Sequence, residues 1–181
     1  MKAAARFWRF LDDVAASAGD ASATALTSAL RSALASVSMA DRRQFWLRYD
    51  EATWALYSYD VWGCAAITCG GDLSDDWFEY WRRWSVLQGG DLHRGMLVDP
   101  DAALADYWES VGLMRLPRDA VLDFCNGEAA CSAFADCGVD LWATSRRVRA
   151  RMDAGPAGTP WTSRSEWQQR FPALIRLFGG R

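Results

Sequence analysis

Apolar residues recur at intervals of three and four along most of the chain, which is the period of an amphipathic helix. Phe7, Leu11 and Val14 share one face over residues 3–17, and Leu26 and Leu30 share one face over residues 21–36. No convincing strand pattern of period two is present. The spacing therefore predicts further helices, which are expected over residues 38–58, 60–69, 75–88, 100–110, 117–125, 128–136, 139–152 and 173–178.

Polar residues at helix starts sharpen several of these boundaries. Ser38 is expected to cap the helix that it precedes, and Asp60 the short apolar one after it. Asp99 with a proline at the first helical position predicts another start. Ser163 and Glu166 have the spacing of a capping box.

Glycine and proline mark the connections. Residues 89–95 contain three glycines and predict a turn, and residues 154–162 predict an internal loop. We therefore expect an all-α fold, with a single compact domain over residues 1–181 built from about eight to ten helices, several of them short.

Composition narrows the possible functions. The 181 residues are 51% hydrophobic and 24% charged, which are globular values, and the formal net charge is -3. An acidic chain without a basic stripe argues against nucleic-acid binding. No apolar run reaches the roughly 20 residues of a membrane span. Arg146–Arg151 form the most basic stretch, which is interpreted as a solvated helix face.

Few residues are available for metal or nucleophilic chemistry. The single histidine, His93, lies in the glycine-rich stretch and is expected to be a surface or loop residue. An odd count of five cysteines, with no secretory signal, favours free thiols in a reducing compartment and hence the cytoplasm. None of them forms a Cys-x-x-Cys pair. We therefore expect no metal site and no cofactor.

Tryptophan is the compositional outlier, with eleven residues. Trp77, Trp81 and Trp84 are spaced four and three apart, which places them on one face of a helix. This spacing favours a tryptophan-rich core. An aromatic-lined ligand pocket is the alternative.

The densest polar cluster lies between residues 70 and 82. Gly70 and Gly71 permit a tight turn, and Ser74, Asp75 and Asp76 follow it at a helix start. One interpretation is structural, because a serine cap and two carboxylates stabilise the positive end of a helix.

The other interpretation is a ligand site at the same turn. Asp75 or Asp76 would act as a base or bind a cation, Arg82 would hold an anion, and Tyr59 and Trp62 would form an aromatic wall. An EF-hand calcium loop is excluded, because its sixth and twelfth positions are occupied by Trp77 and Arg83.

The same region resembles a bacterial family called domain of unknown function 4240. The resemblance is carried by Tyr59-Asp60-Val61-Trp62-Gly63, Gly70-Gly71, Ser74-Asp75-Asp76 and Phe78 to Arg82. Asp99-Pro100-Asp101 and Phe171-Pro172-Ala173-Leu174 also look like it, whereas Asp72-Leu73 stands where the family has a single cysteine. The family lends no established activity.

Two functions remain open at this point. The first is an accessory or interaction module that binds a partner protein, which predicts an exposed aromatic patch with a polar rim. The second is an enzyme or small-ligand binder at residues 70–82, which predicts that Asp75 and Asp76 line a concave pocket. Nothing in the sequence specifies an oligomeric state.

Overall fold

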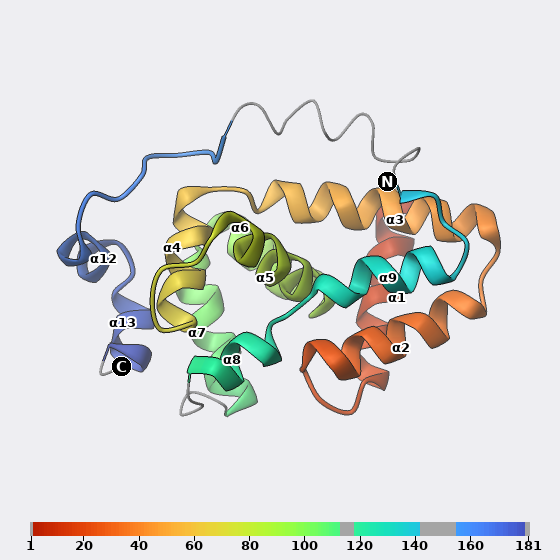
Figure 1. Ribbon diagram of the computed structural model, residues 1–181, viewed down its shortest axis with the longest axis horizontal. Coiled ribbons are helices and arrows are strands. Elements are labelled where there is room, and N and C mark those ends of the chain that lie inside the picture. The colour runs from red at the N-terminus through yellow and green to blue at the C-terminus, as the bar shows by residue number, and fades with distance from the viewer. Residues whose placement is uncertain (1, 113–117, 142–154, 180–181) are drawn as a thin grey trace.

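The computed structural model describes residues 2–112, 118–141 and 155–179 (Figure 1). Within these ranges the regular secondary structure is helical, and the one β feature is an isolated parallel bridge between Ser58 and Ala157. The predicted all-α class is confirmed. The helices are α1 (Lys2–Ser17), α2 (Ala23–Ala35), α3 (Met39–Ala55), α4 (Tyr59–Thr68), α5 (Asp75–Leu87), α6 (Gly90–Val98), α7 (Pro100–Val111), α8 (Arg118–Phe124), α9 (Glu128–Asp136), α12 (Arg164–Arg170) and α13 (Pro172–Phe178).

Serine caps begin a run of four helices. In each, the serine hydroxyl oxygen accepts a hydrogen bond from the backbone N–H three residues later, which satisfies one of the unpaired donors of the first turn. The capping residues are Ser22, Ser38, Ser58 and Ser74. The expected cap of α4 is corrected by this finding, because Ser58 and not Asp60 caps it. Asp99 caps α7 as predicted.

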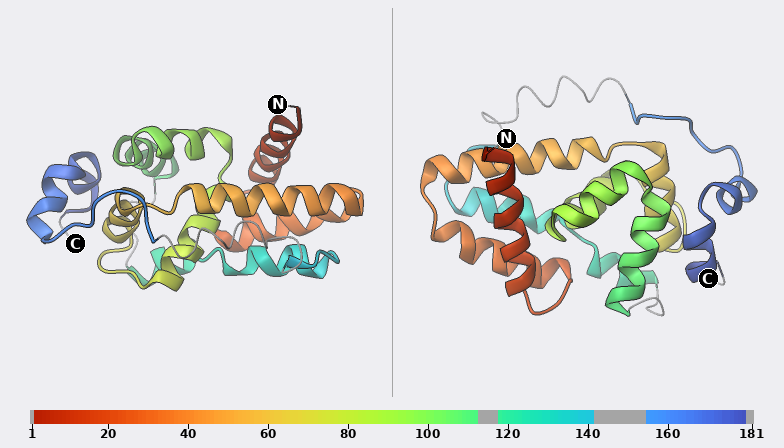
Figure 2. Two further views of the ribbon diagram at one scale, coloured as in Figure 1. Left: turned by 90° about the horizontal axis from the view of Figure 1, so that it is seen from above. Right: turned by 180° about the vertical axis from the view of Figure 1, so that it is seen from behind.

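The long helix α3 runs along one side of the molecule, with α5 beside it in the middle (Figure 1). Helices α2 and α9 pack on each other at one end, and α1 covers that end from behind (Figure 2). Helices α12 and α13 lie at the opposite end, where α13 packs against α4 and α7. The C-terminal residues thus close the end of the molecule that contains the Gly70–Gly71 turn.

Tryptophan side chains form much of the core. Trp81 and Trp84 of α5 are buried, and the ring of Trp84 stacks on that of Trp108 at 5.8 Å. Trp77, the third member of the predicted face, is only half-buried and contacts the edge of Tyr80. The tryptophan-rich core is therefore confirmed for two of the three positions.

The segment predicted as a glycine-rich turn is in fact the start of α6. Gly89 has a φ of 106°, and the carboxylate of Asp12 in α1 accepts a hydrogen bond from Gly90 N at 2.9 Å. This cap comes from a residue far away in the sequence, so the local pattern does not reveal the helix.

The prediction for His93 was also wrong, since its ring is buried within α6. It packs on Trp8, and its Nε2 lies 3.1 Å from the carbonyl oxygen of Ala52. Burial lowers the pKa of His93, and the hydrogen bond to Ala52 opposes that effect. The ring is therefore neutral at neutral pH and contributes to packing.

Candidate functional site

The predicted acidic turn is the start of α5. Ser74 Oγ accepts a hydrogen bond from Trp77 N at 3.3 Å. Asp75 and Asp76 are exposed in the first turn, and Asp75 Oδ1 accepts a hydrogen bond from the hydroxyl of Tyr57 at 3.2 Å. These groups have the geometry of a helix cap and of charges that favour the helix dipole.

Arg82 lies inside the protein, against the ring of Tyr57, whose hydroxyl donates to Asp75. It is 1% exposed, and its Nη1 donates a hydrogen bond to the carbonyl oxygen of Thr53 at 3.0 Å. Its guanidinium lies 4.6 Å from the ring centroid of Tyr57 and 4.7 Å from that of Phe78. Burial lowers the pKa of Arg82 to about 10, so it stays charged at neutral pH. Enclosed by rings, the group has no route to a solvent-borne anion.

Tyr59 and Trp62 lie on α4, where they contact Trp161 from the C-terminal part of the chain. Their ring centroids are 5.9 Å and 6.4 Å from that of Trp161, both in edge-to-face arrangements. Trp62 also stacks on Phe78 at 4.8 Å and donates a hydrogen bond to the carbonyl oxygen of Leu73. The two predicted wall residues thus hold a third aromatic ring in place.

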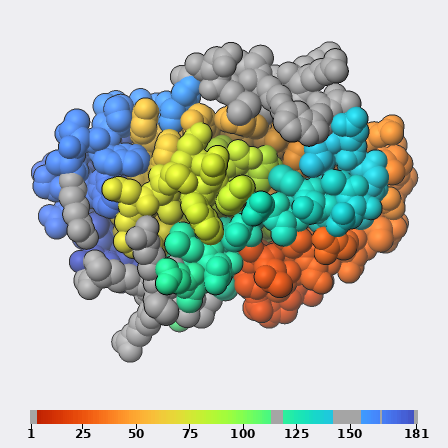
Figure 3. Space-filling model, in the orientation of Figure 1, coloured from red at the N-terminus to blue at the C-terminus, as the bar shows by residue number. Residues whose placement is uncertain are grey.

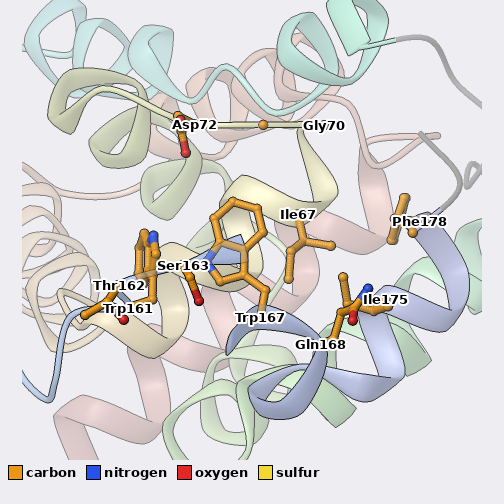
Figure 4. A pocket seen from close by; sticks show the side chains of 12 residues that line it. Ile67, Gly70, Asp72, Trp161, Thr162, Ser163, Trp167, Gln168, Ile175 and Phe178 are labelled. Carbon is orange, nitrogen blue, oxygen red and sulfur yellow. The ribbon is translucent and has the colours of Figure 1, made fainter. Parts of the chain in front are cut away.

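A pocket of about 460 Å³ lies between the Gly70–Gly71 turn and the C-terminal segment, which we define as residues 155–179. Figure 4 shows Asp72 across the pocket from Trp161 and Trp167. Asp75, Asp76 and Arg82 are not among the residues that line it. Its lining consists of Ile67, Gly70, Gly71, Asp72, Trp161, Thr162, Ser163, Trp167, Gln168, Ile175, Phe178 and Gly179.

The walls of the pocket combine aromatic rings with a few polar groups. The rings of Trp161 and Trp167 meet nearly at right angles, with centroids 5.9 Å apart and 74° between the planes. The indole N–H of Trp167 is buried and has no hydrogen-bond partner among the described residues. Among the lining residues that the structure describes, Asp72 carries the one charge.

The glycine turn offers this pocket no free backbone donors. Gly70 and Gly71 have φ angles of 75° and 153°, conformations that glycine adopts without strain. Gly70 N donates to the carbonyl oxygen of Ile67 at 3.1 Å, and Gly71 N donates to that of Ala66 at 2.9 Å. Both N–H groups are therefore used to end α4, as in a helix C-cap.

A carboxylate holds the rim of the pocket at the start of α12. Glu166 Oε2 accepts hydrogen bonds from the backbone N and the hydroxyl of Thr162, at 2.8 Å and 3.2 Å. Both bonds lower the pKa of Glu166, and the bond from the backbone N of Thr162 has the larger effect. The predicted capping box is not formed, because Ser163 makes no side-chain cap hydrogen bond and Glu166 instead accepts from the backbone N of Thr162, one residue before the cap.

Two aspartates attach the C-terminal segment to the rest of the molecule. Asp101 Oδ2 and Oδ1 accept hydrogen bonds from the backbone N–H groups of Ala173 and Leu174, each at 2.8 Å. Asp60 forms an ion pair with Arg170. In the space-filling view the C-terminal segment lies directly against the region of α4 and α5 (Figure 3).

A close contact completes this attachment. The Cα of Gly63 faces the ring of Phe171, and a Cβ at Gly63 would lie 2.5 Å from the ring atom Cε2. Glycine thus allows α4 to approach the start of α13. This contact sets how closely α4 and the C-terminal segment approach, and the pocket lies between these two parts of the chain.

Sequence reasoning missed Trp161, Trp167 and the rest of the C-terminal wall. These residues lie in an irregular stretch and a short helix, where periodicity carries little information. The predicted basic stretch Arg146–Arg151 lies outside the described residues. Among the described residues no group of three or more His, Cys, Asp or Glu side chains is placed to hold a metal ion. None of the described helices has both the length and the apolar character needed to cross a membrane.

The fold and the pocket define an all-helical protein whose C-terminal helices enclose a ligand-sized space. Residues 2–127 match the model of a family described as a protein of unknown function, DUF4240. This is more than half of the chain, so the chain belongs to that family. No curated protein and no solved structure matches this chain.

Several contacts join the matched range, residues 2–127, to the C-terminal segment. Asp60, Gly63 and Asp101 lie inside it, yet the residues that they contact lie between positions 170 and 174, outside it. The resemblance of Phe171-Pro172-Ala173-Leu174 to the family also falls outside the match. The part that belongs to the family therefore carries the attachment points for the C-terminal segment.

Proposed function

We propose that this protein binds a small molecule in the pocket between the Gly70–Gly71 turn and the C-terminal segment. The observation that carries this proposal is the pocket itself. Its volume of about 460 Å³ lies within the range of roughly 300–1,000 Å³ that small-molecule sites occupy. Apolar and aromatic walls with a few polar groups are typical of such sites.

Binding is a better description of this site than catalysis. No His or Cys is among the described residues that line the pocket. Asp72 is the one acid among them, and the hydroxyl of Ser163 hydrogen-bonds with that of Ser165 rather than with a base that would activate it. The unpaired N–H of Trp167 supports a ligand site, because a buried donor gains stability from an acceptor.

The lack of disulfides supports a cytoplasmic location as part of this proposal. None of the five cysteines, all of which the structure describes, forms a disulfide, which is the usual state in a reducing compartment.

Binding to a partner protein is the second candidate. Its expected aromatic patch is not present among the described residues, where the exposed large hydrophobic side chains are Met39, Leu97 and Val98. Leu97 and Val98 are 52% and 88% exposed at the end of α6, and this pair is the observation that favours a docking surface.

Two neighbouring substitutions test the small-molecule proposal. Gln168 and Gln169 are both exposed on α12, and only Gln168 lines the pocket. We expect Gln168→Trp to fill part of the pocket and to abolish the binding of compounds selected from a fragment library by saturation-transfer NMR. Gln169→Trp, the matched control, should bind them as the parent does. If no fragment binds the parent, or if both variants bind equally, the proposal fails.

A further inference from the structure

We propose that the ligand of this pocket is an organic cation, either a protonated amine or a quaternary ammonium compound. This inference rests on the proposed function and names its ligand class. The first observation is the aromatic corner made by Trp161 and Trp167, whose planes are 74° apart. The contact is edge-to-face, so a compact cation in this corner would lie beside both rings, attracted to the electron-rich face of an indole.

The corner is held in place before any ligand arrives. Trp161 contacts Trp167 and, on α4, the rings of Tyr59 and Trp62. Trp62 is in turn fixed by its stack on Phe78 and its hydrogen bond to Leu73. A ligand therefore meets rings that are already ordered, which reduces the entropy lost on binding.

The charge of the lining favours the same class. Asp72 is the one charged side chain among the described lining residues, and it lies across the pocket from the two indoles (Figure 4). An ammonium group between them is attracted by the carboxylate as well as by the rings. An anion would be repelled by that carboxylate.

The backbone also disfavours anions. Glycine turns bind phosphate or carboxylate groups through free N–H groups. Here Gly70 N and Gly71 N both donate to carbonyl oxygens of α4. The turn therefore provides shape and no donors.

A pair of probes of the same shape tests the ligand class. Choline and 3,3-dimethylbutan-1-ol differ in having a quaternary nitrogen or a quaternary carbon, so they separate charge from shape. We expect choline to bind at least about tenfold more tightly by isothermal titration calorimetry, which is the size of a partly desolvated cation–π contact. Equal or tighter binding of the neutral alcohol would overturn the proposal.

Two variants with matched controls locate the effect. Trp161→Leu should remove most of the preference for choline, whereas Trp77→Leu, which truncates a tryptophan away from the pocket, should keep it. Asp72→Asn should weaken choline severalfold and leave the alcohol unchanged, and Asp76→Asn should change neither. Asp72 and Asp76 are exposed, so this second pair tests the proposal even if Trp161→Leu perturbs folding.

The outcomes separate the ligand class from the proposed function. If fragments bind in a manner that Gln168→Trp abolishes, but choline shows no advantage over the alcohol, the site stands and the cation is wrong. If choline binds equally to the parent and to Gln168→Trp, its binding lies elsewhere and the proposal fails. If neither fragments nor choline bind the parent, both proposals fail together.

Discussion

A pair of aspartates and a single aspartate interact with helix starts in this protein in different ways. Asp75 and Asp76 are adjacent, exposed and part of the first turn of α5 itself. Asp101 is 8% exposed and accepts two hydrogen bonds from the start of α13, a helix more than seventy residues later. The pair is conspicuous in the sequence, whereas Asp101 attaches helix α13, which supplies part of the pocket wall.

The comparison shows how a local cluster of charge differs from a long-range contact. A carboxylate at its own helix start interacts with a dipole that water screens. A buried carboxylate that binds N–H groups of another helix orders two parts of the chain, and its loss leaves donors unsatisfied. The following substitutions test that difference, from the largest expected effect to the smallest.

The largest loss is expected from Asp101→Ala. Removing the acceptor of one buried and one part-buried N–H group should lower the free energy of unfolding by about 2–3 kcal/mol. For a chain of this size the thermal midpoint should fall by about 4–12 °C. Asp106→Ala is the matched control, since Asp106 is exposed on the same helix. A circular-dichroism melt that shows equal midpoints for the two variants would refute the role of Asp101.

Gly63→Ala should have the next largest effect. Its Cβ would overlap the ring of Phe171, and overpacking of this kind lowers the free energy of unfolding by about 1–3 kcal/mol. The same substitution made in a Phe171→Leu background should be less harmful, because the ring tip is gone. Urea unfolding of the four proteins gives the coupling energy. A coupling of zero would show that the contact does not hold the segment.

Asp75→Asn together with Asp76→Asn should have a smaller effect. The loss of two exposed charges at a helix start should lower the free energy of unfolding by about 0.5–1 kcal/mol, and the midpoint by about 1–4 °C. The difference should shrink at high salt. Fragment binding should be unchanged. Loss of binding in this variant would instead place the site at the acidic turn.

The smallest expected effect is a pH-dependent change at the pocket rim, caused by protonation of Glu166. Because the folded protein lowers the pKa of Glu166, its contribution is present above the unfolded value of 4.5 and is lost as the pH falls through the folded pKa. The indole N–H signals of Trp161 and Trp167 should therefore shift with a midpoint below 4.5. Glu166→Gln should abolish this transition. A midpoint at or above 4.5 would contradict the hydrogen bonds to Thr162.

The sequence was sufficient for features that depend on neighbouring residues. The cap at Ser74, the start of α7 at Asp99 and Pro100, and the burial of Trp81 and Trp84 follow from local spacing. These are interactions within one or two helical turns, which periodicity and capping preferences describe.

The remaining features depend on contacts between distant residues. Helix α6 begins where Asp12 of α1 caps Gly90, and no local pattern predicts that bond. The expected cap Asp60 instead pairs with Arg170, which leaves capping to Ser58. For the same reason the sequence points to Asp75 and Asp76, whereas the pocket that we propose as the site lies beside Gly71, since its second wall comes from residues 161–179.

The most direct test of this account is a crystal structure of the protein soaked with the tightest-binding compound from the fragment screen. The account predicts electron density for the compound between Gly71, Trp161 and Trp167, with α13 still attached to Asp101. Density for the compound against the exposed face of Asp75 and Asp76, with the pocket unchanged, would contradict it.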